Sequence, residues 1–197
     1  MAHNYELIAV AASAGGLAAV SELLRALPAS LDVPVVIVQH RAATSPAQVL
    51  PHLLSRAAKG RRVKEAEEGD PLEPNTVYVA PANFHLLLDE RRTLHLSDGR
   101  RIKYLRSSAN PLLESAARAL DGRVIAVVLT GSGTDATDGV QEVRTRGGTV
   151  IAQDPTQAEH PSMPTSAIQS GAVDYILPLQ EIAPMLVQLT GAGVTLP

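Results

Sequence analysis

Residues 7–27 read LIAVAASAGGLAAVSELLRAL: an apolar run, a turn of small residues, and then a helical pattern. The run at residues 7–11 is short and unbroken, as in a strand buried on both faces. Apolar side chains then recur at positions 17, 20, 23, 24 and 27, which is the spacing of one helix face. A strand that passes through a Gly-rich turn straight into a helix indicates an α/β fold.

The rest of the chain repeats this strand–helix alternation. Four more short apolar runs predict buried strands, at residues 35–38, 124–129, 149–152 and 173–177. Helical patterns lie between or after them, at residues 46–57, 112–120, 140–146 and 180–189. Such alternation predicts a three-layer, doubly wound α/β fold with a mostly parallel sheet. The length of 197 residues fits a single domain over residues 1–197.

One region breaks the alternation. Residues 76–80, 85–89 and 93–97 come closer to an alternation of apolar and polar side chains than the other runs do, and short polar turns separate them. We expect an antiparallel β-hairpin there, at one edge of the sheet. The charged, turn-rich stretch at residues 60–74 is interpreted as a connection.

Composition excludes several classes of protein. The chain has no Cys, which removes disulfides, Cys-based zinc sites and a thiol nucleophile. The net charge of -3 gives no reason to expect nucleic acid as a partner. No apolar run approaches the roughly 18 residues of a membrane span, and the first residues do not resemble a signal peptide. We therefore expect no membrane insertion and a cytoplasmic location.

Ser13 lies in the turn that follows the first predicted strand. Ligands of open α/β sheets bind at the carboxyl ends of strands, and the N–H groups that begin the next helix can stabilise negative charge. Ser13 is therefore a candidate nucleophile. Two other interpretations stay open at this point: Ser13 caps the helix, or the loop binds a phosphate.

His40 and Asp135 follow two other predicted core strands. His40 comes directly after residues 35–38, and Asp135 follows the glycine-containing loop at residues 130–134. A Ser, a His and an Asp that each follow a separate strand indicate a Ser-His-Asp triad, in which Asp135 orients the imidazole. Their order along the chain differs from that of α/β-hydrolases, and Ser13 lacks the G-x-S-x-G elbow. Asp138 was expected to cap the following helix.

Several of these segments together resemble the catalytic domain of the chemotaxis protein-glutamate methylesterases (the CheB family). The segments that carry the resemblance cover almost the whole chain: residues 11–16, 39–42, 77–81 with 85–87, 108–117, 129–136, 152–154 and 162–168. The resemblance implies a serine hydrolase of two-component chemotaxis signalling. It would cleave glutamate 5-O-methyl esters on a methylated receptor-type protein, giving glutamate and methanol, and would deamidate some glutamines.

The resemblance also implies roles for individual residues. Ser13, His40 and Asp135 correspond to the family's catalytic triad. The oxyanion hole and pocket are implied at Ala14, Gly15, Ser132 and Gly133, and the substrate cleft at Arg41 and Met163. The implied mechanism requires no metal and no cofactor. Signalling partners would act in trans.

The chain departs from the family pattern around the implied pocket. Ala14, Arg41, Ser132 and Ala136 replace the Thr, Met, Met and Gly of the family motifs. These changes motivate an alternative hypothesis, a binding module of the same fold with weak or no catalysis. A nucleotide-binding domain is a third interpretation, although the loop lacks a P-loop Lys.

The family's full-length members carry a phospho-receiver domain ahead of the esterase. A domain of about 100 residues does not fit before Ser13, so we expect either a piece of a longer protein or a stand-alone esterase. Met1 lies a few residues before the first predicted strand, which favours the stand-alone form.

Overall fold

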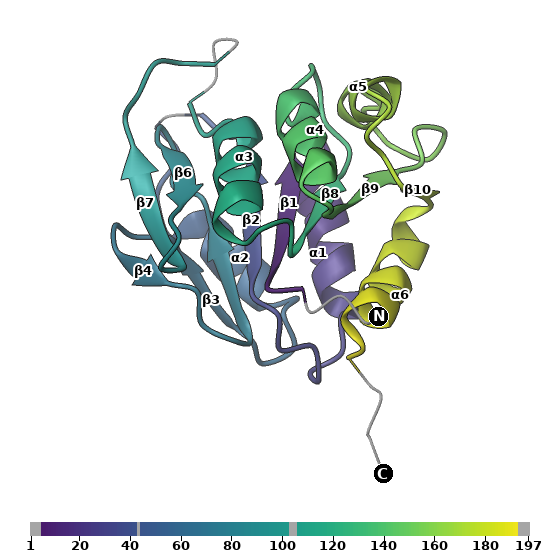
Figure 1. The fold of residues 1–197 in the computed structure, drawn as a ribbon. Coiled ribbons are helices and arrows are strands. Elements are labelled where there is room, and N and C mark those ends of the chain that lie inside the picture. Colours follow the sequence, from purple (N-terminus) through teal and green to yellow (C-terminus); the bar gives the residue numbers. More distant parts are fainter. Residues whose placement is uncertain (1–4, 43, 103–105, 193–197) are drawn as a thin grey trace.

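A computed structural model describes residues 5–42, 44–102 and 106–192 (Figure 1). Its main feature is a seven-stranded sheet with the order β10-β9-β8-β1-β2-β5-β3, in which each pair of neighbouring strands is parallel. Its strands are β1 (Leu7–Ala12), β2 (Val35–Gln39), β3 (Arg62–Glu65), β5 (Thr76–Val79), β8 (Val124–Val128), β9 (Thr149–Gln153) and β10 (Tyr175–Leu177). The predicted parallel sheet is confirmed.

β1 lies in the middle of the sheet, and every one of its residues is buried. Its neighbours on the two sides are β2, which places Ala12 opposite Gln39, and β8, which places Ala11 opposite Val128. The apolar run at residues 7–11 therefore has the burial that its unbroken pattern predicted.

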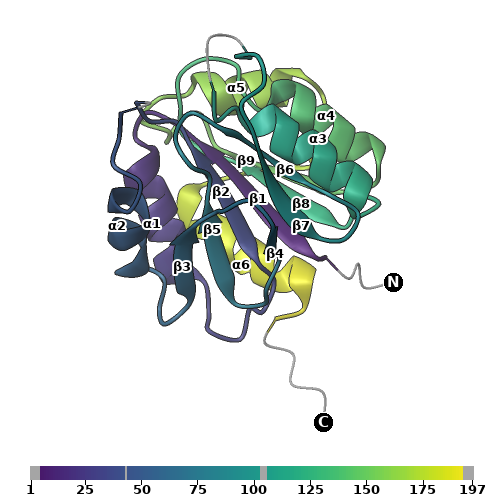
Figure 2. The same ribbon diagram turned by 90° about the vertical axis from the view of Figure 1, so that its left-hand side faces the viewer.

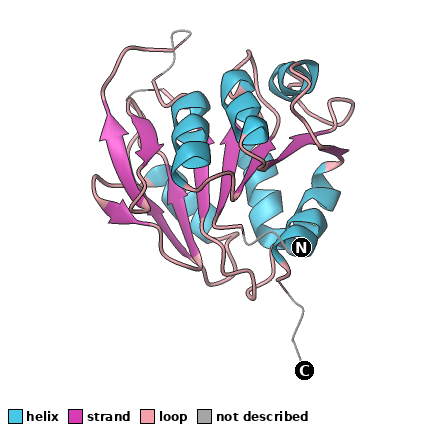
Figure 3. Ribbon diagram, viewed as in Figure 1, coloured by secondary structure: helices cyan, strands magenta, loops and turns pink. Residues whose placement is uncertain are grey.

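Helices cover both faces of this sheet (Figures 2 and 3). One face carries α1 (Gly16–Ala26), α2 (Val49–Ser55) and α6 (Leu179–Thr190), and the other carries α3 (Ala109–Ala119), α4 (Thr137–Thr145) and α5 (Ser162–Gln169). Alternate residues of β1 enter the two cores: Ile8 and Val10 face α1, whereas Ala9 and Ala11 face α3 and α4. The three-layer, doubly wound architecture is confirmed.

The predicted hairpin is present and belongs to a second sheet. β6 (His85–Leu88) and β7 (Thr93–Ser97) pair antiparallel, and β7 also pairs with β4 (Asp70–Pro71). The expectation that residues 76–80 belong to this antiparallel region was wrong, because β5 lies in the parallel sheet between β2 and β3. β3 and β4 both occur within the stretch interpreted as a connection.

Several helices differ from the sequence expectations, and α3 begins at Ala109, before the predicted residue 112. α2 begins at Val49, so Ser45 and Pro46 lie before the helix. α4 begins at Thr137, with Ala136 at the N-cap, so Asp138 lies in the first turn and is not the cap. α5 was not predicted, because its eight residues contain a Pro and lack a clear apolar periodicity.

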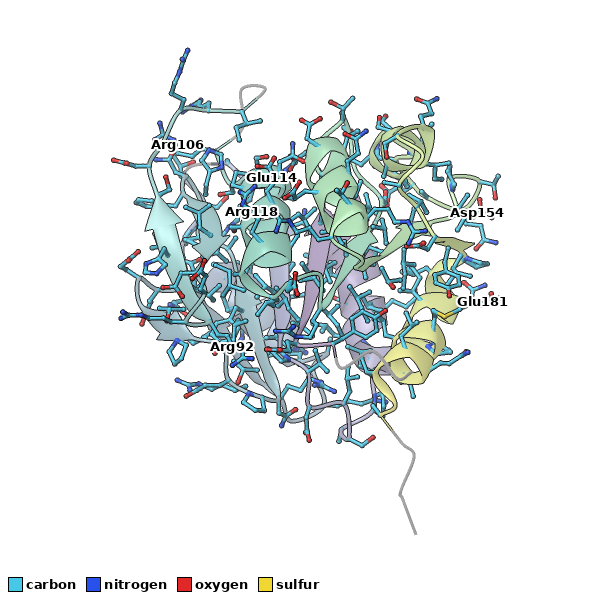
Figure 4. All side chains as sticks on the ribbon, in the orientation of Figure 1. Arg92, Arg106, Glu114, Arg118, Asp154 and Glu181 are labelled. Atoms are coloured by element: carbon cyan, nitrogen blue, oxygen red, sulfur yellow. The ribbon has the colours of Figure 1, made fainter. Side chains whose placement is uncertain are left out.

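On α3, Glu114 and Arg118 lie one helical turn apart on the face away from the sheet (Figure 4). A guanidinium nitrogen of Arg118 is 3.9 Å from a carboxylate oxygen of Glu114.

The order of the strands creates a switch point at the centre of the sheet. From β1 the chain continues through α1 on one face, whereas from β8 it continues through α4 on the other. Ligands of doubly wound sheets bind where neighbouring strands diverge in this way, outside their carboxyl ends. No described helix reaches the length and apolarity that crossing a bilayer requires.

Candidate active site

Three loops meet at the carboxyl ends of the central strands β2, β1 and β8. The backbone N–H of Ser13 donates to the Thr130 carbonyl at 3.0 Å, and the N–H of His40 donates to the Ala12 carbonyl at 3.1 Å. These bonds continue the ladder of the sheet by one residue. They bring the three segments that follow the strands into register at one rim, as the sequence predicted.

His40 and Asp135 form a close pair at this rim. The His40 Nε2 lies 2.7 Å from the Asp135 Oδ2, and the two side chains are 10% and 2% exposed. A carboxylate is an acceptor, so Nε2 carries the hydrogen and donates it. Among the described residues Nδ1 has no hydrogen-bond partner, which leaves this nitrogen able to accept a proton from a neighbouring hydroxyl.

Asp135 accepts two further hydrogen bonds from the start of α3. The Ser108 hydroxyl donates to Oδ1 at 2.5 Å, and the Ala109 N–H donates to Oδ2 at 2.7 Å. Burial by itself would raise the pKa of Asp135, but the hydrogen bonds from His40, Ala109 and Ser108 outweigh it, and the pKa lies below its ordinary value. Asp135 is therefore an anion with a fixed orientation, held at a helix N-terminus that also favours negative charge.

Two hydrogen bonds to the Ser13 carbonyl hold the loop that carries this residue. The Gln39 side chain donates from Nε2 to the Ser13 carbonyl at 2.7 Å, and the Gly16 N–H donates to the same oxygen at 2.8 Å. Gly131 lies against the serine: a Cβ added there would be 2.8 Å from the Ser13 Cβ and would overlap the Met163 sulfur. Only a residue without a side chain fits between Ser13 and Met163.

Several backbone N–H groups near Ser13 have no acceptor within the described residues. They belong to Ala14 and Gly15, directly after the serine, and to Ser132 and Gly133, in the loop after β8. Gly15 and Gly133 adopt left-handed φ values of 73° and 89°, which turn both loops sharply. The candidate oxyanion donors of the sequence are therefore free to bind a ligand oxygen.

Arg41 and Met163 occupy different surroundings from each other. The Arg41 guanidinium forms an ion pair with Glu65 and donates to the Ala80 carbonyl at 3.1 Å, so its charge is already compensated. Arg41 also lines a cavity beside His40. Met163 is fully buried beneath Gly131 and contributes no exposed surface to the cleft.

Sequence reasoning did not identify the residues that hold the pair in place. Ser108 was part of a matched segment without a role, although a Ser before a helix is a recognisable N-cap, and its hydroxyl also accepts from the Asn110 N–H. His85 contacts Ser108 in turn. Its Nδ1 accepts from the Ser108 N–H at 3.3 Å and its Nε2 donates to the Arg100 carbonyl at 3.1 Å.

Two more rim features became visible only in the structure. Glu159, far along the chain, lies over the nucleophile loop: a Cβ on Gly15 would be 2.8 Å from its Oε2. Ala136 has a φ of 73°, which costs an L-residue about 1–2 kcal/mol and explains why Gly suits this position in the family motif.

Space for a ligand exists next to the serine. A cavity of about 650 Å³ opens beside it and is lined by Ser13, Gly15, Gly16, Leu17, Ala18, Ser21, Glu22, Arg25 and Gln39. Within the ranges that the structure describes, no cluster of three or more His, Asp or Glu side chains is arranged to hold a metal ion. The site thus combines a candidate nucleophile, a candidate base paired with an oriented carboxylate, and backbone N–H groups without an acceptor among the described residues.

The chain is similar to known proteins of one family over most of its length. The model of the CheB methylesterase family matches residues 8–186. A putative protein-glutamate methylesterase/protein-glutamine glutaminase of Leptospira interrogans is 38% identical over 186 residues, covering 94% of this chain and 95% of the relative. The protein-glutamate methylesterase FrzG of Myxococcus xanthus is 39% identical, over 93% of this chain and 54% of its own length. The chain thus spans almost all of the Leptospira protein and about half of FrzG.

A solved structure has the same fold. The CheB methylesterase catalytic domain of Thermotoga maritima superposes with a TM-score of 0.89 at 34% sequence identity. The match covers 94% of this chain and 98% of that domain. Fold, order of elements and sequence therefore agree over almost the same stretch of chain.

Proposed function

Because this chain belongs to the CheB methylesterase family, we propose that it is a serine hydrolase that cleaves glutamate 5-O-methyl esters on a receptor-type protein. The observation that carries the proposal is the 2.7 Å pair of His40 and Asp135 beside the Ser13 loop. A buried carboxylate that fixes one ring nitrogen, with the other nitrogen free, is the arrangement that a general base requires.

The first half of the reaction forms an acyl-enzyme. His40 accepts the Ser13 proton at Nδ1 while Ser13 Oγ attacks the ester carbonyl carbon, and Asp135 stabilises the imidazolium that results. The N–H groups of Ala14 and Ser132 donate to the oxyanion of the tetrahedral intermediate. His40 then returns the proton to the departing methoxide, and methanol leaves.

The second half regenerates the enzyme. Water, deprotonated by His40, attacks the acyl carbon, and Ser13 leaves with the proton that His40 holds. The product is a glutamate side chain. A primary amide presents the same carbonyl geometry and would release ammonia in place of methanol, so deamidation of glutamine belongs to the same proposal. The steps use side chains and backbone of this chain alone.

The remaining assignments follow from the family. We take residues 1–197 as one catalytic domain, acting in the cytoplasm on the methylated receptor-type protein of a chemotaxis or related signalling pathway, with signalling partners in trans. The names of the Leptospira and Myxococcus relatives, both protein-glutamate methylesterases, support this substrate class.

The test is release of labelled methanol. A receptor-type protein is esterified with a methyl-labelled donor and incubated with the wild type or with Ser13→Ala. We expect the wild type to release methanol and the variant to lose about 10⁴-fold or more of kcat.

A fluorophosphonate probe provides an independent readout, because it labels an activated serine whatever the substrate. Labelling of the wild type and none of Ser13→Ala is the expected result. A wild type that neither releases methanol nor reacts with the probe would instead support the binding module without catalysis.

A further inference from the structure

A second cavity adjoins the candidate site on the side of His40. It has a volume of about 260 Å³ and is lined by Leu17, Gln39, His40, Arg41, Ser45, Pro46, Val49, Leu50 and Leu53. Leu17 and Gln39 also line the cavity that contains Ser13. The two spaces therefore meet at the candidate triad, one on the serine side and one on the histidine side. We call the second one the α2 groove.

The α2 groove exposes an unusual amount of apolar surface. Leu17, Val49 and Leu53 are 41%, 50% and 39% exposed. Elsewhere in the described ranges, the large apolar side chains exposed to this extent are Phe84, Tyr175 and Ile176. Half of the exposed large apolar residues thus gather at one edge of a polar active site. An apolar patch bordered by polar groups is typical of a surface that binds a partner.

Two exposed apolar side chains of α2 form a ridge along this surface. Val49 and Leu53 are four residues apart, so they lie on the same face of the helix and form a ridge of one helical turn. Pro46 and His52 extend the ridge outward, where they line a further space of about 350 Å³ with Gln48, Val49 and Leu53. Ridges of this spacing fit the grooves of another helix.

Charge does not compete with apolar binding in the α2 groove. Arg41 is the cation in its lining, and its guanidinium is paired with Glu65 and the Ala80 carbonyl. The side-chain nitrogen of the neighbouring Gln39 donates to the Ser13 and His40 carbonyls. An apolar side chain entering the groove therefore displaces water and leaves no ion unpaired, which is the favourable case for burial.

The occupant follows from the position of the groove relative to the serine. The ester carbonyl of a glutamyl methyl ester is three bonds from its Cα, so the main chain of the substrate must pass close above Ser13 and His40. Residues that flank the ester then lie against whatever adjoins the triad, and on the His40 side that is the α2 groove. The surface is therefore continuous with the path of the substrate.

We propose that the α2 groove binds an apolar side chain of the esterified protein, one helical turn from the glutamyl ester, and so selects which glutamates are hydrolysed. This inference rests on the proposed function for the identity of its substrate. The contact is of the helix-in-groove kind, in which apolar residues at i and i+4 provide the specificity.

Two synthetic helical peptides test the proposal. Both carry one glutamyl methyl ester at the centre. One has Leu at the positions four residues before and after it, and the other has Gln at these two positions. We expect the wild type to hydrolyse the Leu peptide with about tenfold higher kcat/KM, the effect of burying one apolar side chain.

The groove variant is Val49→Gln combined with Leu53→Gln, which should lose the preference for the Leu peptide. The matched control is Ile176→Gln on β10, because Ile176 is as exposed as Val49 (50%) and lies on the opposite edge strand. The control should keep the wild-type preference. Urea midpoints of all variants establish that each remains folded.

Binding is measured separately from hydrolysis, with fluorescently labelled peptides and the Ser13→Ala variant. Tighter binding of the Leu peptide without hydrolysis by the wild type would contradict the proposed function and support the groove. Hydrolysis of both peptides with equal kcat/KM and equal affinity would overturn the groove and leave the esterase intact. A dimer that dissociates in the Val49→Gln/Leu53→Gln variant would show a second copy of the chain in the groove and would also overturn the inference.

Discussion

Two histidines of this protein are paired with carboxylates at the same distance but in different surroundings. His40 Nε2 lies 2.7 Å from Asp135, and His95 Nδ1 lies 2.7 Å from Glu68. The first pair is buried at the rim of the parallel sheet, whereas the His95 and Glu68 side chains on the second sheet are 38% and 60% exposed. Distance alone would not distinguish a catalytic pair from a surface ion pair.

The difference lies in the second ring nitrogen. His95 Nε2 is also engaged, 3.1 Å from Asp89, so a carboxylate faces each ring nitrogen and the pair favours the protonated ring. The hydrogen bonds that the ring donates to Glu68 and Asp89 accordingly raise the pKa of His95. His40 has one nitrogen fixed by a buried anion and the other free. A histidine can act as a general base when a carboxylate fixes one ring nitrogen and the other ring nitrogen makes no hydrogen bond.

The largest expected effect comes from removing the charge of each carboxylate in turn. Asp135→Asn should lower kcat for ester hydrolysis by about 10⁴-fold, because the amide favours the wrong tautomer of the neighbouring imidazole. Glu68→Gln, the matched change at the exposed pair, should leave kcat within about twofold. The measurement is methanol release at neutral pH. An equal loss of kcat in the two variants would contradict a specific catalytic role for Asp135.

A smaller effect is expected from the residue that orients Asp135. Ser108→Ala removes the 2.5 Å hydrogen bond to Oδ1 and should lower kcat about tenfold, the weight of one hydrogen bond to a charged group. Ser108→Thr keeps a hydroxyl and should restore most of the rate. KM should stay near its wild-type value in both variants.

The helix cap that Ser108 provides would also be lost in Ser108→Ala, at a cost of about 1 kcal/mol in the free energy of unfolding. Urea titration separates the two roles. If kcat per folded molecule equals that of the wild type, Ser108 acts only as a cap.

The smallest effect concerns stability against pH at the exposed pair. The pKa of His95 is higher in the folded state than in the unfolded one. Its contribution is therefore complete below the unfolded value, about 6.5, and is lost as the pH rises through the folded value. The difference in urea midpoint between the wild type and His95→Asn should be largest below about pH 6.5 and should shrink as the pH rises above that value.

The Asp135 pair should respond in the opposite direction. The pKa of Asp135 is lowered in the folded state, so its contribution is present above the unfolded value of about 3.9 and is lost on acidification. For His95, the result that would contradict a raised pKa is a difference in urea midpoint between the wild type and His95→Asn that grows as the pH rises.

Much of the architecture was predictable because burial on two faces leaves a clear pattern. The runs around Val10, Val36 and Val127 are unbroken because each strand contacts helices on both sides. β5 was misassigned because its four buried residues are followed closely by a hairpin, and a strand's own sequence does not encode which strand it pairs with. α2 begins later than Pro46 because a Ser-Pro pair permits a helix start without requiring one.

The candidate triad was predictable for a similar reason. Ser13, His40 and Asp135 each follow a core strand, and parallel strands bring their carboxyl ends to one rim. Whether these three residues carry out catalysis stays a prediction. Ser108, Gln39 and the exposed side chains of the α2 groove were not identified, because each acquires its role from a contact more than 20 residues away in the chain or from a neighbour on another helix.

The amino-acid sequence was enough to predict the kind of fold, the rim of the sheet where a ligand can bind and the three candidate side chains there. It was enough because periodicity, turn residues and the ends of strands are local properties of the chain. Contacts between distant segments set the rest: which ring nitrogen of His40 meets Asp135, that Ser108 and Ala109 hold that carboxylate, and that Glu65 neutralises Arg41. These outcomes depend on distances between segments that the sequence does not contain, and they separate an oriented base from an ordinary ion pair.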